Sequence, residues 1–116
     1  YTGNPLACRA ACAVLDLFER GHVIDANRGS AARFTALCAP LKDHPRVRNF
    51  RHLGMIWAFE VASPGPGFAM RAFEAALARG VLLRPIGNTV YFMPPYILAD
   101  DEFALLVATG LALADL

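Results

Sequence analysis

A single arginine, Arg84, lies in a stretch of residues 82–96 that is otherwise uncharged and mostly apolar, small or aromatic (LLRPIGNTVYFMPPY). Burying a guanidinium without a partner is costly. No acidic residue lies between Arg79 and Asp100, so the local sequence offers no carboxylate to pair with it. Because arginine presents a planar fork of donors that matches a carboxylate, Arg84 is a candidate anion-binding residue. The alternative is an arginine whose aliphatic stem covers apolar surface while its charged end reaches water.

The residues around Arg84 predict a β-hairpin. Residues 81–85 and 89–93 have the composition of two strands, and a Gly-Asn pair at 87–88 is a suitable turn between them. Pro85 indicates that the hairpin lies at a sheet edge or bends there, because proline cannot donate to a ladder.

The register of this hairpin brings two candidate ligand-binding residues together. In a two-residue hairpin Ile86 faces Thr89, and counting outward places Arg84 opposite Tyr91. Side chains at such positions lie on one face, about 5 Å apart at Cβ, close enough to contact one ligand. The residues that follow, Pro-Pro-Tyr at 94–96, would complete an apolar and hydrogen-bonding wall.

The rest of the chain predicts helices and strands that position this hairpin. A first helix has Asn4 as N-cap, Pro5 at its first position and Gly21 as its stop. Further helices are expected at 23–41, 68–79 and 100–116, strands at Val47–Leu53 and 55–61, and a loop at 63–67. Two pairs of sequential strands predict an α+β domain, a small and mostly antiparallel sheet covered by helices.

Helical and strand spacing predicts the core. The second helix is expected to bury one face and strand 55–61 both of its faces, and the last helix to begin at an Asp100 N-cap. The expected core residues are Phe34, Leu37, Cys38, Leu41, Trp57, Phe59, Phe73, Ala76, Leu77, Phe103, Leu106 and Val107.

Composition limits the classes of partner. The chain has 116 residues, enough for one domain, and its net charge of +1 comes from 11 basic and 10 acidic side chains. The basic residues are spread along the sequence, so no nucleic-acid binding is expected. The longest uncharged stretch, 85–99, is short and interrupted by prolines and glycine, so no membrane span is expected. The apolar content of 56% is high, which indicates that some apolar surface meets another domain or subunit.

The cysteines and histidines predict a reducing compartment and no metal site. Three cysteines are an odd and sparse set, and the chain does not start with a signal-peptide pattern, so a cytoplasmic location is expected. Cys8 and Cys12 are four residues apart, but no second close pair of ligands accompanies them. With Cys38 they are expected to be small core-facing residues. Three histidines without ligand spacing are expected at the surface or in loops: His22, His44 and His52.

Three stretches resemble the class III pyridoxal-phosphate aminotransferases. YTGNPLACRAA (1–11) is similar to the motif that opens a helix throughout this family. GVLLRPIGNTVYFMPPYIL (80–98) resembles the more specific C-terminal hallmark of one branch, and VRNFRHLGMIWAFEV (47–61) resembles the paired strands that precede it. The resemblance covers essentially the whole chain.

The resemblance implies a fold-type I transferase of which this chain is the C-terminal small domain, 21–116, preceded by a linking helix, 1–20. A large domain outside the chain would supply the Schiff-base lysine and most of the pyridoxal-phosphate cradle, and the full protein would be a homodimer. Lys42 lies in a predicted surface turn and matches no Schiff-base motif. The family's phosphate-binding Thr or Ser falls just before Tyr1, and Thr2 is out of that register.

The resemblance also assigns the two hairpin residues. Arg84 matches an arginine that binds the carboxylate of an oxo-acid substrate with a long apolar chain, and Tyr91 matches a tyrosine of the substrate pocket. The implied reaction is a two-step amino transfer between small molecules, for which the isolated chain would be inactive. Two alternatives remain open: another class III aminotransferase acting on ornithine or a related ω-amino acid, and a free-standing small-molecule- or protein-binding module.

Overall fold

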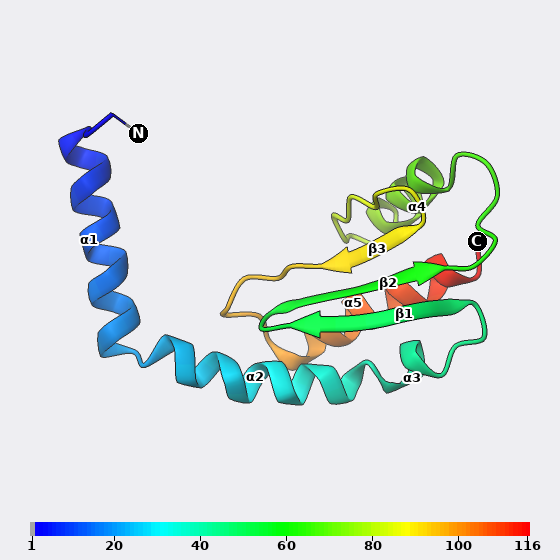
Figure 1. The fold of residues 1–116 in the computed structure, drawn as a ribbon, viewed down its shortest axis with the longest axis horizontal. Helices are drawn as coiled ribbons and strands as arrows, with labels where there is room; N and C mark the ends of the chain where they lie inside the picture. Colours follow the sequence, from blue (N-terminus) through cyan, green and yellow to red (C-terminus); the bar gives the residue numbers. More distant parts are fainter. Residues whose placement is uncertain (1) are drawn as a thin grey trace.

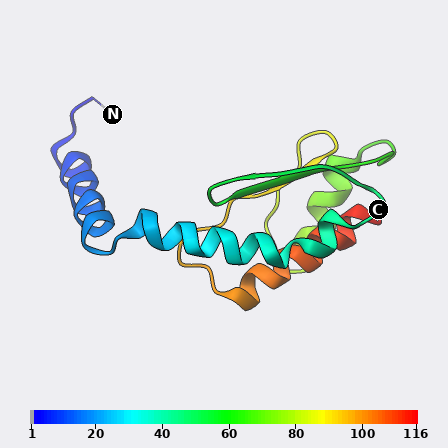
Figure 2. The ribbon, with the colours of Figure 1, turned by 60° about the horizontal axis from the view of Figure 1, so that its bottom comes forward.

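The computed structural model describes residues 2–116 as an α+β chain with one three-stranded antiparallel sheet. In chain order the elements are α1 (Pro5–Arg20), α2 (Val23–Leu37), α3 (Ala39–Lys42), β1 (Val47–Leu53), β2 (Ile56–Val61), α4 (Phe68–Leu77), β3 (Thr89–Phe92) and α5 (Asp100–Ala114). The strand order is β1-β2-β3. Helices α2, α4 and α5 lie on one side of the sheet, whereas α1 projects away from it (Figures 1 and 2). The predicted fold class is confirmed. Within the described residues, each helix is too short or too polar to span a bilayer.

Helix α1 is set by local signals and buries no residue in the described chain, although its Phe18 ring meets the Tyr96 ring edge-on, with centroids 5.8 Å apart. The Asn4 side-chain oxygen accepts hydrogen bonds from the backbone N–H groups of Leu6 (3.0 Å) and Ala7 (3.3 Å). Pro5 occupies the first helical position and Gly21 ends the helix, as predicted. No residue of α1 is buried, and Figure 1 shows the helix standing clear of the sheet. The motif's first residue, Tyr1, lies outside the described residues.

The expected helix 23–41 is two helices. Helix α2 ends at Leu37, and the short α3 begins after Cys38. Pro40 is the cause, because it lacks an N–H and its ring would clash with the carbonyl four residues earlier. The Cys38 carbonyl instead accepts hydrogen bonds from the N–H groups of Leu41 (3.0 Å) and Lys42 (3.1 Å). Cys38 and Leu41 are buried as predicted, but Leu37 is exposed.

The sheet is buried on one face only. Trp57, Phe59 and Val61 of β2 are fully buried, whereas the alternating residues Ala58 and Glu60 are half-buried. The expectation that 55–61 is buried on both faces is therefore wrong, because the helices of the described chain cover only one side (Figure 2).

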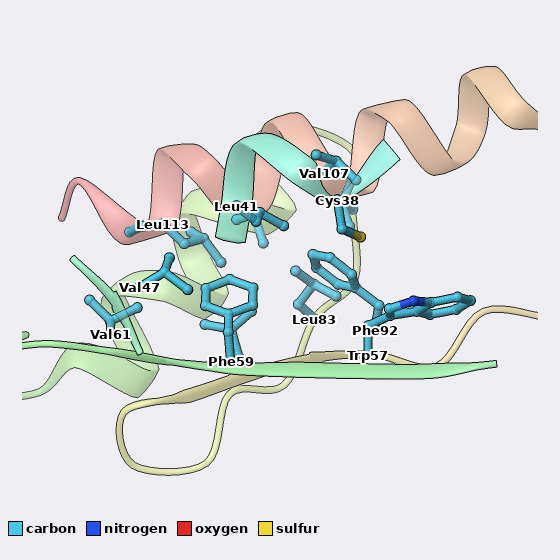
Figure 3. Packing of buried hydrophobic residues seen from close by; sticks show 14 of the residues in the cluster. Cys38, Leu41, Val47, Trp57, Phe59, Val61, Leu83, Phe92, Val107 and Leu113 are labelled. Carbon is cyan, nitrogen blue, oxygen red and sulfur yellow. The ribbon is translucent and has the colours of Figure 1, made fainter. Parts of the chain in front are cut away.

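Aromatic rings fill the space between the sheet and α5 (Figure 3). Phe34 of α2 stacks on Phe103 of α5, with ring centroids 4.3 Å apart. Trp57 meets Phe103 edge-on at 4.9 Å, and its indole N–H donates to the Thr35 hydroxyl at 2.8 Å. These contacts confirm Trp57 and Phe103 as core residues and attach α2 and α5 to the same face of the sheet.

The last two helices differ from expectation at their ends. Helix α4 ends at Leu77 rather than residue 79, and Leu77 is exposed while Ala76 is buried. Helix α5 has Ala99, not Asp100, as N-cap; the Glu102 carboxylate accepts from the Ala99 N–H at 2.8 Å. The Asp100 carboxylate instead pairs with Arg33 of α2 at 2.8 Å.

Helix α5 approaches the sheet closely at Gly110. A Cβ at this position would lie 2.8 Å from the Phe92 Cζ atom and 3.3 Å from the Phe59 Cζ atom. Both rings are fully buried in a packed core, so neither can move aside cheaply.

We expect Gly110→Ala to lower the free energy of unfolding by about 1–3 kcal/mol, because the added methyl group overpacks the core. Gly29→Ala is the matched control: Gly29 lies inside α2 with nothing within 4 Å of a new Cβ, and alanine there favours the helix by about 0.5–1 kcal/mol. Urea unfolding of both variants is the measurement. Equal shifts in the same direction would show that α5 does not pack as described.

Candidate functional site

The turn that precedes β3 forms as predicted. Ile86 and Thr89 exchange two backbone hydrogen bonds, each 2.9 Å long, around the pair Gly87 and Asn88. Gly87 has a φ of +59°, in the left-handed region that favours glycine. This turn was predictable because it depends only on the four residues that form it.

The predicted ladder beyond this turn does not form. Residues 81–85 are not a strand, and the pairing stops at Ile86 and Thr89. The burial of Val81 and Leu83 in the core, rather than pairing with β3, sets the path of this segment. Strand β3 pairs along its other edge with β2, where Tyr91 is the partner of Ala58. The prediction of a strand at 81–85 is therefore wrong, and no ladder holds Arg84 opposite Tyr91.

Arg84 lies in an extended segment whose side chains alternate between core and surface. Val81 and Leu83 are buried, whereas Leu82 and Arg84 are exposed. The Arg84 guanidinium is therefore not desolvated in this chain, contrary to the expectation of a buried charge. Within residues 2–116 no carboxylate lies within ion-pair distance of it.

Arg84 lines an open hollow between α4 and the segment that follows it. The lining residues are Ala69, Met70, Phe73, Leu82, Arg84 and Pro85, and the volume is about 530 Å³. We call this the Arg84 hollow. Its size falls within the range of small-molecule sites, roughly 300–1,000 Å³. Arg84 is its only charged lining residue, so the hollow suits an anion with an apolar body.

The other arginine-containing hollows differ from the Arg84 hollow in charge. In a hollow between α2 and the β1–β2 turn, Arg28 pairs with Asp25 at 2.8 Å. A hollow on α1 contains Arg9 and Arg20 together with two acidic residues at 16 and 19. Among the hollows described, only the Arg84 hollow is lined by an arginine that has neither an acidic residue in the same lining nor a carboxylate in ion-pair distance.

Tyr91 and the Arg84 hollow remain separate in this chain. Tyr91 is half-buried and alternates with Val90 and Phe92, which face the core, so it lies on the sheet face that the helices leave uncovered. It is not among the residues that line the hollow. Its shared role with Arg84 stays a prediction.

Sequence reasoning missed Met70 and Leu82 as site residues and assigned Phe73 to the core. Two residue spacings in the sequence indicate which of these side chains share a face. Met70 and Phe73 are three residues apart on α4, hence on one face, and Leu82 precedes Arg84 by two in an extended segment. Only the tertiary structure brings the two segments together.

Lys42 does not fit the site of a Schiff-base lysine. Its ammonium lies 5.2 Å from the centroid of the Phe50 ring, at the end of α3. None of the four hollows described is lined by Lys42. Thr2 is exposed and lines none of them either.

The cysteines and histidines form no metal site: in the part of the chain described, no three His, Cys, Asp or Glu side chains gather. Cys8 and Cys12 are exposed, so the expectation that they face the core is wrong for this chain, whereas Cys38 is buried. Burial raises the pKa of the Cys38 thiol to about 11, which the Lys42 ammonium partly opposes.

The histidines lie at the surface or in turns, as predicted. His22 and His52 are exposed, and His52 stacks on Trp57. His44 is half-buried in the turn before β1, where its Nε2 lies 3.1 Å from the Asp115 carboxylate.

Comparison with known proteins gives concordant matches. Residues 1–109 match the sequence model of the class III aminotransferase family. The adenosylmethionine-8-amino-7-oxononanoate aminotransferase of Helicobacter pylori is 43% identical over 113 residues, which cover 93% of this chain and 26% of that protein. An omega-aminotransferase of Caulobacter vibrioides is 30% identical, covering 94% of this chain and 26% of its own length.

A solved structure shares the fold. The crystal structure of adenosylmethionine-8-amino-7-oxononanoate aminotransferase from Methanocaldococcus jannaschii superposes with a TM-score of 0.88 at 30% identity, covering 99% of this chain and 28% of that one. The chain thus spans about a quarter of the length of the curated relatives it matches.

We expect two cysteines, Cys8 and Cys12, to react with a thiol reagent in the folded chain at pH 8, and Cys38 only after unfolding. The thiolate is the reactive form, and Cys38 is both inaccessible and protonated there. The number of thiols that react with and without denaturant tests this prediction. Cys38→Ala is the control, because it removes the thiol that should react only after unfolding. Simultaneous reaction of all three thiols would contradict the packing of α2 and α3.

Proposed function

We propose, given that this chain belongs to the class III aminotransferase family, that the full protein transfers an amino group from S-adenosylmethionine to 8-amino-7-oxononanoate, giving 7,8-diaminononanoate for biotin synthesis. The names of the Helicobacter and Methanocaldococcus relatives support this choice of substrates. So does the similarity of residues 80–98 to the hallmark of that branch. Pyridoxal phosphate, bound by the full protein, supplies the chemistry that carries the amino group.

This chain would act as the C-terminal small domain, residues 21–116, joined by the helix at 1–20 to a larger domain. The distribution of burial supports this division, since the core residues run from Ala31 to Ala114 and α1 contributes none. We assign the Schiff-base lysine and most of the cofactor cradle to the remainder of the protein, which would be a cytoplasmic homodimer.

The role of this chain in the reaction would be to position the oxo acid. The observation that carries the proposal is Arg84: an exposed arginine in an apolar hollow, with no carboxylate of the described chain in reach. Its guanidinium would pair with the carboxylate of the acceptor through two parallel hydrogen bonds. Held at that end, the acceptor has its ketone oriented toward the reacting centre. Tyr91 would contribute a hydroxyl to the same substrate once the full protein is assembled.

A second candidate is an aminotransferase acting on another ω-amino compound. The Caulobacter relative, named an omega-aminotransferase, favours this reading. Both candidates share the cofactor and the fold, and they differ in the amino donor and in what Arg84 binds.

We expect Arg84→Ala in the full protein to raise the KM for the oxo acid by roughly 10- to 100-fold, the effect of losing a charge-assisted hydrogen-bonded pair. The half-reaction with the amino donor should change little, because the donor does not need this clamp. Steady-state kinetics with each substrate varied in turn make the measurement.

Two controls sharpen this test. Arg79→Ala removes an exposed arginine that lies after α4 and outside the Arg84 hollow, and it should leave both constants unchanged. Arg84→Lys keeps the charge but loses the fork, so an intermediate KM is expected. An acceptor KM unaffected by Arg84→Ala would refute the clamp.

A further inference from the structure

We propose that Arg48 and Arg51 close the free edge of β1 and so keep this edge from pairing with the sheet of a second copy of the protein. The sheet order β1-β2-β3 leaves one edge of β1 without a neighbouring strand in the described chain. Unpaired backbone groups along such an edge are a template for the addition of another strand, which leads to aggregation. An edge whose backbone groups already have partners from its own chain does not offer this template.

The edge at β1 is the longer of the two edges of the sheet. Strand β1 has seven residues, whereas β3 has four. The outer edge of β3 is also partly used, because Thr89 exchanges two backbone hydrogen bonds with Ile86. Very short edge strands are poor templates for pairing, so β1 is the edge that needs protection.

The first backbone groups of the β1 edge have partners within the chain. The Ala62 N–H donates to the Arg46 carbonyl at 2.8 Å, so residue 46 directs its carbonyl toward the β2 side. The next residue, Val47, therefore directs its backbone groups toward the free edge. Its N–H donates to the His44 carbonyl at 3.0 Å, and its carbonyl accepts from the Arg48 guanidinium at 2.8 Å. Both groups that an added strand would need at Val47 are thus occupied.

A β-bulge and Arg51 close the middle of the edge. Two residues of β1, Asn49 and Phe50, lie opposite the single residue Phe59 of β2. Asn49 has a φ of +52°, so the backbone leaves the extended path that a pairing strand would follow. The Asn49 carbonyl accepts from the Arg51 guanidinium at 2.8 Å. A strand from another molecule would have to displace this donor and straighten the bulge before it could pair.

Glu60 of β2 holds the side chains of this bulge in place. Its carboxylate accepts from the Asn49 amide at 2.8 Å and from the Arg51 guanidinium at 3.3 Å. Charged side chains and bulges are both means by which natural sheets avoid pairing edge to edge, and β1 combines them. All these partners belong to the described chain, so the closure does not depend on what the remainder of the protein covers.

Replacing both arginines tests the proposal. Arg48→Thr together with Arg51→Thr removes the two guanidiniums and introduces residues that suit a strand. We expect the full protein with both changes to form larger species at a concentration roughly tenfold lower than the unchanged protein, the effect of losing about one charge-assisted hydrogen bond. Sedimentation velocity over a concentration series makes the measurement, and infrared spectroscopy detects intermolecular β-sheet in the larger species.

The matched control is Arg9→Gln together with Arg79→Gln, which removes the same charge from two exposed arginines outside the sheet. This control should associate no more than the unchanged protein. The fluorescence of the buried Trp57 checks that each variant is folded. If the double threonine variant is unfolded, Arg51→Thr alone should shift association in the same direction by a smaller factor. Association equal to that of the control, or larger species without intermolecular β-sheet, would overturn the proposal.

Discussion

The burial of Val81 and Leu83 is the interaction on which the candidate site depends. The segment they belong to has no strand partner, so these side chains, rather than a hydrogen-bonded ladder, fix its orientation. The backbone adds one anchor at its start, where the Val81 N–H donates to the Ala76 carbonyl at 3.0 Å. With the odd positions buried, Leu82 and Arg84 must face outward. The outward position of Arg84 thus follows from the packing of Val81 and Leu83 into the core on the opposite side of the segment.

The core that receives these side chains depends in turn on one-sided coverage of the sheet. Trp57, Phe59 and Phe92 project toward α5, and Gly110 lets that helix come close enough to contact the rings (Figure 3). A close-packed core is hardly compressible, so the outward residues are held firmly. Firm placement is what a clamp that orients a substrate requires.

Features set by local chemistry were predictable from the sequence. The Asn4 cap and the Gly87-Asn88 turn formed as predicted because each depends on residues within four positions. The resemblance of residues 1–11 and 80–98 to class III aminotransferases is confirmed by the family match. The break between α2 and α3 at Pro40 could have been predicted from the proline, but a continuous helix was expected because the apolar periodicity continues across it.

Features set by distant segments were not predictable. The composition of residues 81–85 suits a strand, yet the burial of Val81 and Leu83 in the core, rather than pairing with the free edge of β3, sets the path of this segment. Whether one or both faces of strand 55–61 are buried depends on where the helices pack, and the residues of the strand do not indicate this. The Arg84 hollow is formed by α4 together with the segment that follows it, so of its lining residues only Arg84 was predicted as a site residue.

The most direct test of this account is the choice of amino donor by the full-length protein. S-adenosylmethionine, ornithine and ordinary amino acids would each be mixed with the protein, and conversion followed by the change in cofactor absorbance. The account predicts conversion by S-adenosylmethionine and little or none by the others. Conversion only by another amine would contradict it, keeping the family but changing both substrates and the anion expected at Arg84.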